Sequence, residues 1–375
     1  MEGESSQTTE KKIAAALAQH PWTIITTDKN GMKALDLSSF LVDDVPSSIF
    51  TINFILKLDL SNTNLQIIPE ELSNLVSLVS LDLHSNRLRS LPRSIGKLVK
   101  LKYLNLCSNM LSSLPQTIED CSALVELRAD FNELEQLPEG MGFELVYLET
   151  LCVSSNKLSR LPSSVSHMTS LRVLDVHFNK LRMLPQDIGS LIHLQTLNVS
   201  SNFNFLVSLP ESIGALCNLT HLDLSFNQIT TLPDSFAGLE SLKLLNLEGN
   251  PLVVPPPKIA ELGAEAVKHF MAERLHVKVP PKGNVQRIHK SLLQKMTKGK
   301  FGMKWGERNN KKYDNNNDNA VLTEEYDYRS LEEQEEEDGF HSSAPRSPFR
   351  QFLSPRRFFS PRHTPSHHRL NTRGF

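Results

Sequence analysis

Three histidines that each stand two residues from an aspartate are the residues of this chain whose types and spacing first suggest chemistry. Imidazole nitrogens and carboxylate oxygens are ligands that zinc and related metals take from proteins. The three pairs are Asp82 with His84, Asp175 with His177, and His221 with Asp223. A metal site would need at least two of these pairs to meet around one ion.

The repeated pattern described below places the three pairs on strands of one parallel sheet, which fixes how far apart they lie. With about 4.8 Å between neighbouring strands, His84 and His177 are roughly 19 Å apart, and His177 and His221 about 10 Å. Zinc ligands lie only about 2.0–2.3 Å from the ion, so neither distance allows a shared site. The sequence also shows no phosphate-binding loop, no G-x-G-x-x-G, no kinase signature and no paired-cysteine zinc spacing. It therefore predicts no enzyme, no cofactor and no metal.

A unit of about 23 residues, repeated ten times, is the element that must position these side chains. Its pattern is L-x-x-L-x-L-x-x-N-x-L-x-x-L-P-x-x-I-x-x-L, and residues 78–100 follow it closely. Units start 23 residues apart, except for 24 after Leu124 and 25 after Leu194. We count positions from the first residue of each unit, and these first residues are Met32, Ile55, Leu78, Leu101, Leu124, Leu148, Leu171, Leu194, Leu219 and Leu242. A period of this length is typical of leucine-rich repeats.

Positions 3 to 7 of each unit alternate polar and apolar residues and predict a short strand. In the third unit Leu81 and Leu83 would point inward, whereas Ser80, Asp82 and His84 would point outward. Ten such strands at about 4.8 Å make a sheet roughly 45 Å long. A surface of that length suits a protein partner rather than a metabolite.

Asparagine at position 9 predicts how the turn after each strand is held. An Asn amide both donates and accepts hydrogen bonds, so it can satisfy backbone groups of adjacent coils. Phe40 and Thr63 replace it in the first two units, which predicts a looser or specially capped end there. The asparagines are Asn86, Asn109, Asn132, Asn156, Asn179, Asn202, Asn227 and Asn250. Proline at or near the Leu-Pro step of each unit predicts an extended or short-helical return path, because proline lacks an N–H.

These features predict an α/β fold, a leucine-rich-repeat solenoid shaped as a curved horseshoe of ten repeats, with helical caps and a disordered C-terminal tail. The predicted parts are a flexible N-terminus (1–9), an N-terminal cap (10–31), the repeats (32–257), a C-terminal capping helix (258–276), a basic amphipathic segment (277–312) and a disordered acidic, then basic Ser-Pro tail (313–375).

Both predicted caps contain apolar residues at helical spacing. Residues 10–20 predict a short helix, after which Trp22 and Ile24 would cover the first coil. At the other end one helical stripe would seal the last coil, and it consists of Ile259, Leu262, Val267, Phe270, Met271 and Leu275.

A formal net charge of −2 hides strong segmentation. Residues 1–276 carry 21 basic and 30 acidic residues, a net −9, and residues 277–312 carry 11 and 1, a net +10. Residues 313–340 carry 1 and 11, a net −10, and residues 341–375 carry 7 and 0, a net +7. Such blocks indicate interaction segments outside the folded array. The acidic repeat region argues against nucleic acid, which requires a basic footprint.

Residues 284–305 form a basic amphipathic pattern that supports an alternative function. Its apolar face consists of Val285, Ile288, Leu292 and Met296. The segment either packs back on the acidic array, binds a protein partner such as a calmodulin-like cleft, or binds an acidic membrane. The alternative is therefore a peripheral membrane or calmodulin-responsive regulator acting through residues 284–305.

The basic tail contains four proline-directed phosphorylation candidates. Ser347, Ser354, Ser360 and Thr364 each precede a proline and lie near an arginine. A kinase of that specificity would act on at least one of them. The other interpretation is a tail that only keeps the chain soluble.

The predicted concave face is the candidate working surface. Aspartates and asparagines dominate position 5, and phenylalanines fill position 8 in every second unit from the fifth to the ninth. Exposed aromatics beside basic side chains have the composition of interface hot spots, although these rings could instead fold inward under the turn. The candidate partner-binding residues are Asp82, His84, Tyr103, Arg128, Phe131, Asp175, His177, Phe178, His221, Asp223 and Phe226.

The 23-residue unit with its Leu-Pro step resembles the Ras-group class of intracellular leucine-rich repeats. The motif Gly302-Met303-Lys304-Trp305 is similar, at two of four positions, to the G-V-Y-W that follows the repeats in plant intracellular Ras-group-related leucine-rich repeat proteins. The match covers about residues 32–305 and corresponds to a short member of that family. The resemblance implies an intracellular scaffold in signal transduction. It suggests a small GTPase or another signalling component as the partner, although no residue of this chain shows one.

The sequence thus predicts a non-enzymatic, monomeric scaffold or adaptor that binds a protein on its concave face. We expect it in the cytoplasm, with a nuclear or peripheral-membrane location left open, because the N-terminus lacks the design of a signal peptide. No stretch approaches 18 uninterrupted apolar residues, so no transmembrane helix is expected and a membrane surface is a less favoured partner. Four cysteines without a disulfide pattern agree with a reducing compartment.

Overall fold

The computed structural model describes residues 25–27, 31–39, 45–203 and 205–278. Several predictions concern residues outside these ranges: the helix over 10–20 with Trp22 and Ile24, the role of Phe40, the segment over 284–305, the motif at 302–305, and the four Ser-Pro or Thr-Pro sites.

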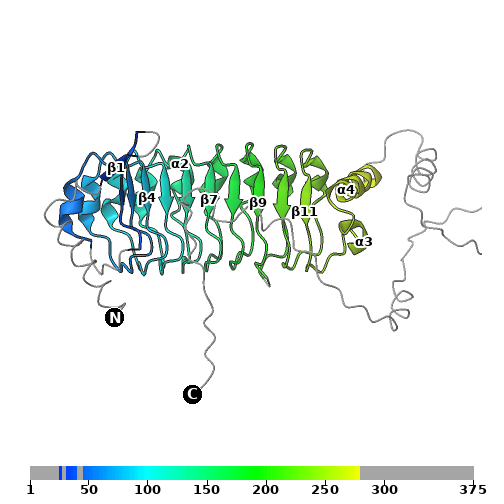
Figure 1. The fold of residues 1–375 in the computed structure, drawn as a ribbon. Coiled ribbons are helices and arrows are strands. Elements are labelled where there is room, and N and C mark those ends of the chain that lie inside the picture. Colours follow the sequence, from blue (N-terminus) through cyan, green and yellow to red (C-terminus); the bar gives the residue numbers. More distant parts are fainter. Residues whose placement is uncertain (1–24, 28–30, 40–44, 204, 279–375) are drawn as a thin grey trace, which may run out of the picture. The chain divides into compact units, whose positions relative to one another are not determined.

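Within the described residues, parallel strands stand side by side in chain order, one from each repeat (Figure 1). Equivalent positions of successive units pair with each other; Leu58, Leu81 and Leu104, for example, stand in register. These inward-pointing leucines are almost fully buried, as the alternation predicts. The parallel strands are β2 (Lys33–Asp36), β3 (Lys57–Asp59), β4 (Ser80–Asp82), β5 (Tyr103–Asn105), β6 (Glu126–Arg128), β7 (Thr150–Cys152), β8 (Val173–Asp175), β9 (Thr196–Asn198), β10 (His221–Asp223) and β11 (Leu244–Asn246).

An additional strand, β1 (Ile25–Thr27), pairs antiparallel with β2 at the first edge of the sheet. Its register places Ile25 opposite Leu35 and Thr27 opposite Lys33. An unpaired sheet edge offers its N–H and C=O groups to other chains, and β1 occupies that edge. The predicted N-terminal cap, residues 10–31, contains these residues, but the sequence did not predict that they form a strand.

In eight of the ten units the return path is a short 3-10 helix that follows the proline step. The prolines before these helices have extended backbone angles, for example φ −64° and ψ 146° at Pro92, which agrees with the predicted extended or short-helical path. The 3-10 helices are η2 (Ser47–Thr51), η3 (Glu70–Asn74), η4 (Arg93–Lys97), η5 (Gln116–Asp120), η6 (Ser163–His167), η7 (Ile188–Ser190), η8 (Glu211–Ala215) and η9 (Asp234–Gly238). The fifth unit, which is one residue longer, has the α-helical turn α2 (Met141–Glu144) instead.

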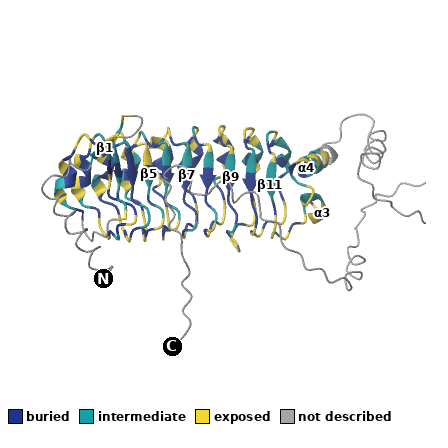
Figure 2. Cartoon of the chain, in the orientation of Figure 1, coloured by how far each residue is buried: buried dark blue, intermediate teal, exposed yellow. Residues whose placement is uncertain are grey.

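The buried side chains form one continuous core that runs through all the units (Figure 2). Strand leucines meet the apolar residue of each return helix there; Leu81 and Ile95 of the third unit are both buried. A single unit buries too little apolar surface to offset the ordering of its own backbone. The units are therefore stable only when stacked.

Two helices rather than one follow the last repeat, which differs from the predicted single stripe. Helix α3 (Pro257–Ala260) and helix α4 (Ala264–Lys278) are separated at Gly263, whose φ of +88° is a left-handed conformation that glycine adopts without strain. The break leaves Leu262 68% exposed. Val267 and Met271 of α4 are fully buried, and Phe270 is only partly buried. The ammonium group of Lys268 donates to the carbonyls of Glu240 and Leu242, at 3.2 and 3.3 Å.

These burials predict different effects for two apolar residues of the C-terminal helices. Met271→Ala should lower the free energy of unfolding by about 2–5 kcal/mol, because it opens a cavity over the last coil. Leu262→Ala is the matched control and should change it by less than about 0.5 kcal/mol. Urea unfolding of the full chain, followed by circular dichroism, measures both. Equal effects of the two substitutions would contradict the assignment of Met271 as the seal.

Candidate partner-binding surface

The asparagine at position 9 holds the turn on which the candidate surface is built. The Oδ1 atom of Asn86 accepts the backbone N–H of Leu65 in the preceding unit at 2.9 Å. Its Nδ2 atom donates to the carbonyls of Leu60, in the preceding unit, and Leu83, in its own, at 2.7 and 3.1 Å. Thr63, the replacement in the second unit, donates its hydroxyl to Leu60 O at 2.7 Å and so supplies one of these bonds. The same bridge between coils is made by Asn109, Asn132, Asn156, Asn179 and Asn250.

The residue just before each of these asparagines has a left-handed backbone. At position 8 the φ values of the non-glycine residues lie between 52° and 63°, and Gly249 of the tenth unit has a φ of 69°. A left-handed backbone costs a residue with a side chain roughly 1–2 kcal/mol. Serine fills this position in five units, which are represented by Ser39, Ser85, Ser108, Ser155 and Ser201.

Three units place phenylalanine in this strained position, and its rings face solvent. Phe131, Phe178 and Phe226 are 59%, 54% and 45% exposed, so the inward-folded alternative is excluded. Bulky residues are uncommon at positive φ, and such residues cluster at functional sites. Exposed rings in a strained backbone do not serve the stability of the fold.

The eighth unit adds two further aromatic side chains beside these three. It is two residues longer than the usual unit, and the extra length lies in the turn around Phe203 and Phe205, which are both exposed. The ring of Phe203 meets that of Phe178 edge to face, with 5.2 Å between the ring centroids. We call the set Phe131, Phe178, Phe203, Phe205 and Phe226 the aromatic row. It follows the carboxyl ends of the strands from the fifth to the ninth unit.

Position 5, predicted as an outward-facing stripe of acidic and polar residues, is buried in five of the ten units and exposed only at Asp36. The aspartates Asp82, Asp175 and Asp223 are 2%, 3% and 5% exposed. Each carboxylate accepts the backbone N–H two residues further on, as Asp82 does from His84 at 2.9 Å. Side chains on strands about 4.8 Å apart also cover one another. The same turn bond is made by Asp36, Asp59, Asn105, Asn198 and Asn246.

Two of the three histidine–aspartate pairs are direct ion-pair partners on the strand face, the surface formed by positions 3, 5 and 7. The Nδ1 atoms of His84 and His177 lie 2.7 and 2.6 Å from the carboxylates of Asp82 and Asp175. The hydrogen bond to Asp82 raises the pKa of His84. At His177 burial lowers the pKa, but the bond and charge of Asp175 outweigh it and the pKa is raised. His221 instead contacts Thr220 Oγ1 at 2.8 Å, and partial burial lowers its pKa. The described residues contain no cluster of three metal-ligating side chains.

The two raised pKa values predict a loss of stability as the pH rises. A histidine with a raised pKa stabilises the fold fully below its ordinary value of 6.5, and this contribution disappears as the pH passes its folded-state pKa. The free energy of unfolding should therefore fall as the pH rises above about 6.5. His84→Gln with His177→Gln should flatten that fall. His221→Gln is the control and should leave the fall in place or steepen it slightly, because a lowered pKa acts in the opposite direction. The midpoints of urea unfolding test this prediction when they are measured for the unchanged protein and both variants at pH values below and above 6.5.

The Asp and Asn side chains at position 5 form a ladder along the sheet. It is interrupted at the fifth and sixth units, where Arg128 and Cys152 replace the usual Asp or Asn. Arg128 forms an ion pair with Glu126 on the same strand. Asp130 takes over the missing acceptor role, because its Oδ1 receives the N–H and hydroxyl of Ser154 at 2.8 and 2.7 Å. Burial raises the pKa of Asp130. The hydrogen bond that position 5 normally makes is thus supplied here by Asp130, two residues after Arg128. Departures from a local sequence rule are expected at functional or strained sites.

The thiols and hydroxyls of this region have no arrangement for nucleophilic catalysis. Cys107 Sγ donates to Asp130 at 3.4 Å, and burial raises the pKa of the Cys107 thiol far above its ordinary value. Burial likewise raises the pKa of Cys152. The hydroxyl of Ser154 donates to Asp130 and that of Ser200 to Asn198, so neither is directed at a histidine.

The predicted site residues therefore fall into three groups. Phe131, Phe178 and Phe226 come together in the aromatic row. The strand face carries Tyr103, Arg128, His84 and His177, of which Tyr103 is exposed and the other three side chains are partly exposed. The three aspartates are buried and hold the turns after their strands, and His221 contacts Thr220.

Sequence reasoning missed an apolar patch at the opposite end of the strands. Phe143, Val146 and Tyr147 are exposed on and after α2, and the ring of Phe143 contacts that of His167 at a tilt of 50°, with 4.7 Å between ring centroids. The extra residue of the fifth unit was the sequence signal for this change of the return helix.

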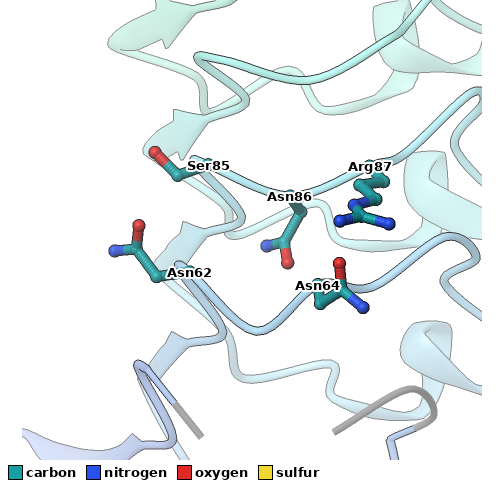
Figure 3. A pocket seen from close by; sticks show the side chains of 5 residues that line it. All are labelled: Asn62, Asn64, Ser85, Asn86 and Arg87. Atoms are coloured by element: carbon teal, nitrogen blue, oxygen red, sulfur yellow. The ribbon is translucent and has the colours of Figure 1, made fainter. Parts of the chain in front are cut away.

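A polar hollow lies on the same turn edge as the aromatic row, between the second and third units. Figure 3 shows it lined by Asn62, Asn64, Ser85, Asn86 and Arg87. The amide of Asn86 is already used to bridge the two coils. The hollow illustrates how polar this edge is where no phenylalanine occupies position 8.

Comparisons with known proteins agree with the repeat geometry. Leucine-rich-repeat family models match residues 55–75, 77–134 and 192–252. The solenoid is built of leucine-rich repeats. A comparison with curated proteins finds no match. No described helix has both the length and the apolarity needed to cross a membrane.

Several solved structures resemble this leucine-rich-repeat solenoid. A leucine-rich-repeat protein of Leptospira interrogans is 34% identical with a TM-score of 0.57, and the match covers 67% of this chain and 59% of that one. The ectodomain of the Arabidopsis thaliana receptor kinase GASSHO1/SCHENGEN3, in complex with CASPARIAN STRIP INTEGRITY FACTOR 2, is 31% identical with a TM-score of 0.54, covering 62% and 29%. The Arabidopsis receptor kinase HAESA, in complex with the peptide hormone IDA and the co-receptor SERK1, is 26% identical with a TM-score of 0.53, covering 63% and 41%.

This chain spans less than two thirds of the length of each of these proteins. The comparisons identify leucine-rich repeats but nothing specific to the plant Ras-group-related family. That finer resemblance remains a prediction from the sequence.

Proposed function

We propose that this leucine-rich-repeat protein is a non-enzymatic adaptor whose protein partner docks on the aromatic row and the adjoining strand face. The observation that carries the proposal is the exposure of three phenylalanines in a strained backbone position that serine fills elsewhere. Exposed aromatic anchors supply much of the binding energy of protein interfaces. The proposed surface continues from the aromatic row onto the strand face at Arg128 and Asp130, where the position-5 ladder is interrupted.

Two further observations support an adaptor rather than an enzyme. The thiols of the strand face are held neutral by burial, and the serine hydroxyls bond to carboxylate or amide oxygens. Leucine-rich-repeat folds typically serve as interaction scaffolds. Among the similar solved structures, GASSHO1/SCHENGEN3 is in complex with CASPARIAN STRIP INTEGRITY FACTOR 2, and HAESA is in complex with the peptide hormone IDA and the co-receptor SERK1.

The finer parts of the proposal rest on the sequence. The resemblance to plant intracellular Ras-group-related proteins supports a role in signal transduction, with a small GTPase or another signalling component as partner. The four cysteines, unpaired in the structure, support a cytoplasmic location. The alternative, a membrane or calmodulin-responsive regulator, depends on residues 284–305, and flotation of that segment with acidic liposomes tests it separately.

The proposal predicts that phenylalanines of the aromatic row can be removed at little cost in stability but at a large cost in binding. Phe178→Ser with Phe226→Ser installs the residue that other units carry at position 8. The free energy of unfolding should change by less than about 1 kcal/mol per site, because the lost ring contacts are partly offset by a side chain that tolerates the turn. Co-purification of the cellular partner should fall about tenfold or more.

Phe143→Ser provides the matched control, since Phe143 is equally exposed but lies at the other end of the strands. It should leave co-purification unchanged. If Phe143→Ser abolishes co-purification and the double variant does not, the partner docks at the α2 edge and the proposal is wrong.

A further inference from the structure

The aromatic row has a repeat distance that restricts the kind of partner it can hold. Phe131, Phe178 and Phe226 occupy the same position in every second unit. The backbone N–H groups of Phe131 and Phe178 donate to Ser154 and Ser200 of the next unit, both at 3.0 Å. These bonds keep the coils at strand spacing beyond the strands themselves. Successive phenylalanines therefore stand two strand spacings apart, about 9.6 Å.

That distance matches one regular peptide conformation better than the others. A polyproline II helix repeats every three residues, after about 9.3 Å. An extended strand presents the same face after about 6.7 Å or 13.3 Å, and either distance differs from the spacing of the phenylalanines by roughly 3 Å or more. An α-helix presents it after about 10.5 Å, at every seventh residue, and accumulates a mismatch of roughly 1.8 Å over two intervals. We propose that the aromatic row binds a proline-rich segment of its partner in the polyproline II conformation, with an apolar ring at every third residue. This inference rests on the proposed function and specifies its partner.

The shape of the row supports the same ligand. A Cβ atom added at Gly249 would lie 2.6 Å from the ring of Phe226, so this ring leans over the next unit. Small residues follow the other two phenylalanines at the same position, namely Ser155 after Phe131 and Ser201 after Phe178. At position 8, rings thus alternate with small residues along one edge of the solenoid, and Phe203 of the intervening eighth unit packs its ring against that of Phe178. Proline-rich segments are bound by aromatic side chains that line the docking surface.

Charge beside the row specifies the ligand further. Lys180 and Arg182 are exposed two and four residues after Phe178. Lys157, in the unit before, is paired with Glu133 at 2.9 Å. The middle of the row is therefore flanked by positive charge, which favours a ligand with carboxylates between its prolines. A polyproline II chain also leaves its backbone carbonyls unpaired, and these basic side chains can donate to them.

The test uses the full chain and three labelled peptides in fluorescence anisotropy. The first peptide has proline at every third residue, with glutamates between, over about nine residues or roughly 28 Å. The second has the same composition in an order that abolishes the three-residue period. The third is an acidic amphipathic helix with an apolar residue at every seventh position. The first should bind about tenfold more tightly than either of the others.

Variants connect that binding to the row. Phe178→Ser with Phe226→Ser should weaken the first peptide about tenfold or more, whereas Phe143→Ser should not. Lys180→Glu with Arg182→Glu should weaken it at low salt, and less so at high salt, because exposed charges are screened.

Three results would overturn the inference. Equal binding of the first and second peptides removes the role of the three-residue period. Tighter binding of the helical peptide through the same phenylalanines replaces the conformation but leaves the adaptor function. If no peptide binds, while the phenylalanine variants still lose their cellular partner, the polyproline inference fails alone; if those variants keep the partner as well, both proposals fail.

Discussion

Asn156→Ala should lower the free energy of unfolding by about 2–4 kcal/mol, because it removes one bridge between the fifth and sixth coils. The N–H of Leu134 loses its acceptor, the Oδ1 atom at 2.9 Å. The carbonyls of Ala129 and Val153 each lose a donor at 2.9 and 3.0 Å, although Asn132 and Asn179 still bond to them. The effect therefore comes chiefly from one orphaned, buried N–H. Urea unfolding of the full chain measures it.

Two further variants show which half of the amide matters. Asn156→Asp keeps an acceptor for Leu134 but cannot donate to carbonyls while it is ionised, so it should be the worse variant at neutral pH and should recover on acidification. Asn218→Ala is the matched control. Asn218 also donates to a carbonyl, that of Ile192 at 2.7 Å, but the bond is exposed to water. Its loss should cost less than about 1 kcal/mol, and a similar cost at both asparagines would refute the account.

The parts of the fold that sequence predicts well are those fixed by the repeat itself. One strand and one proline-led return path recur in each unit, and the asparagine recurs from the third unit on, so an inference from residues 78–100 holds for most of the others. Thr63 follows the same logic, since its hydroxyl supplies part of what an asparagine would. Strand β1 could not be predicted this way, because three residues with an antiparallel partner belong to no period. The break at Gly263 depends on a backbone angle that apolar spacing does not report.

The candidate site was predictable in composition but not in orientation. Alternation correctly placed Asp82 on the outer face of its strand, but it says nothing of the neighbouring strands that cover it there. The direction of Phe131 and Phe178 remained open because the sign of φ in the turn decides it, and hydrophobicity does not. The glycine at position 8 of the last unit, Gly249, was the available hint of a left-handed backbone.

The sequence analysis also did not predict how closely the return helices approach one another, although glycine follows the apolar residue of position 18 in several units. At position 19 the chain has Gly96, Gly142 and Gly189, and Gly214 takes the equivalent place in the longer eighth unit. A Cβ atom added at Gly142 would stand 1.8 Å from the carbonyl oxygen of Ser164 and 2.2 Å from its carbon. Helix α2 and helix η6 thus touch through their backbones at this point. Such an approach is available only to a residue without a side chain.

Gly142→Ala should therefore destabilise the protein by about 3 kcal/mol or more, since overpacking against a backbone cannot be relieved by rotating a side chain. Gly140→Ala, two residues earlier, is the matched control. The three atoms nearest to its Cβ would all belong to the carboxylate group of Glu119, the first at 2.8 Å. That flexible side chain can shift while it still accepts the N–H of residue 140, now at 2.9 Å. The control should change the free energy of unfolding by less than about 1 kcal/mol.

The same variant separates the stability of the array from the action of its aromatic row. Gly142 lies on the return side of the fifth unit, whereas Phe178 and Phe226 stand at the carboxyl ends of strands in later units. At a temperature where Gly142→Ala remains folded, it should bind the partner as the unchanged protein does, although its unfolding midpoint is much lower. Phe178→Ser with Phe226→Ser should give the reverse, a normal midpoint and weak binding. If Gly142→Ala weakened binding as much as the double variant does, while still folded, the return helices would form part of the docking surface and its assignment to the aromatic row would be wrong.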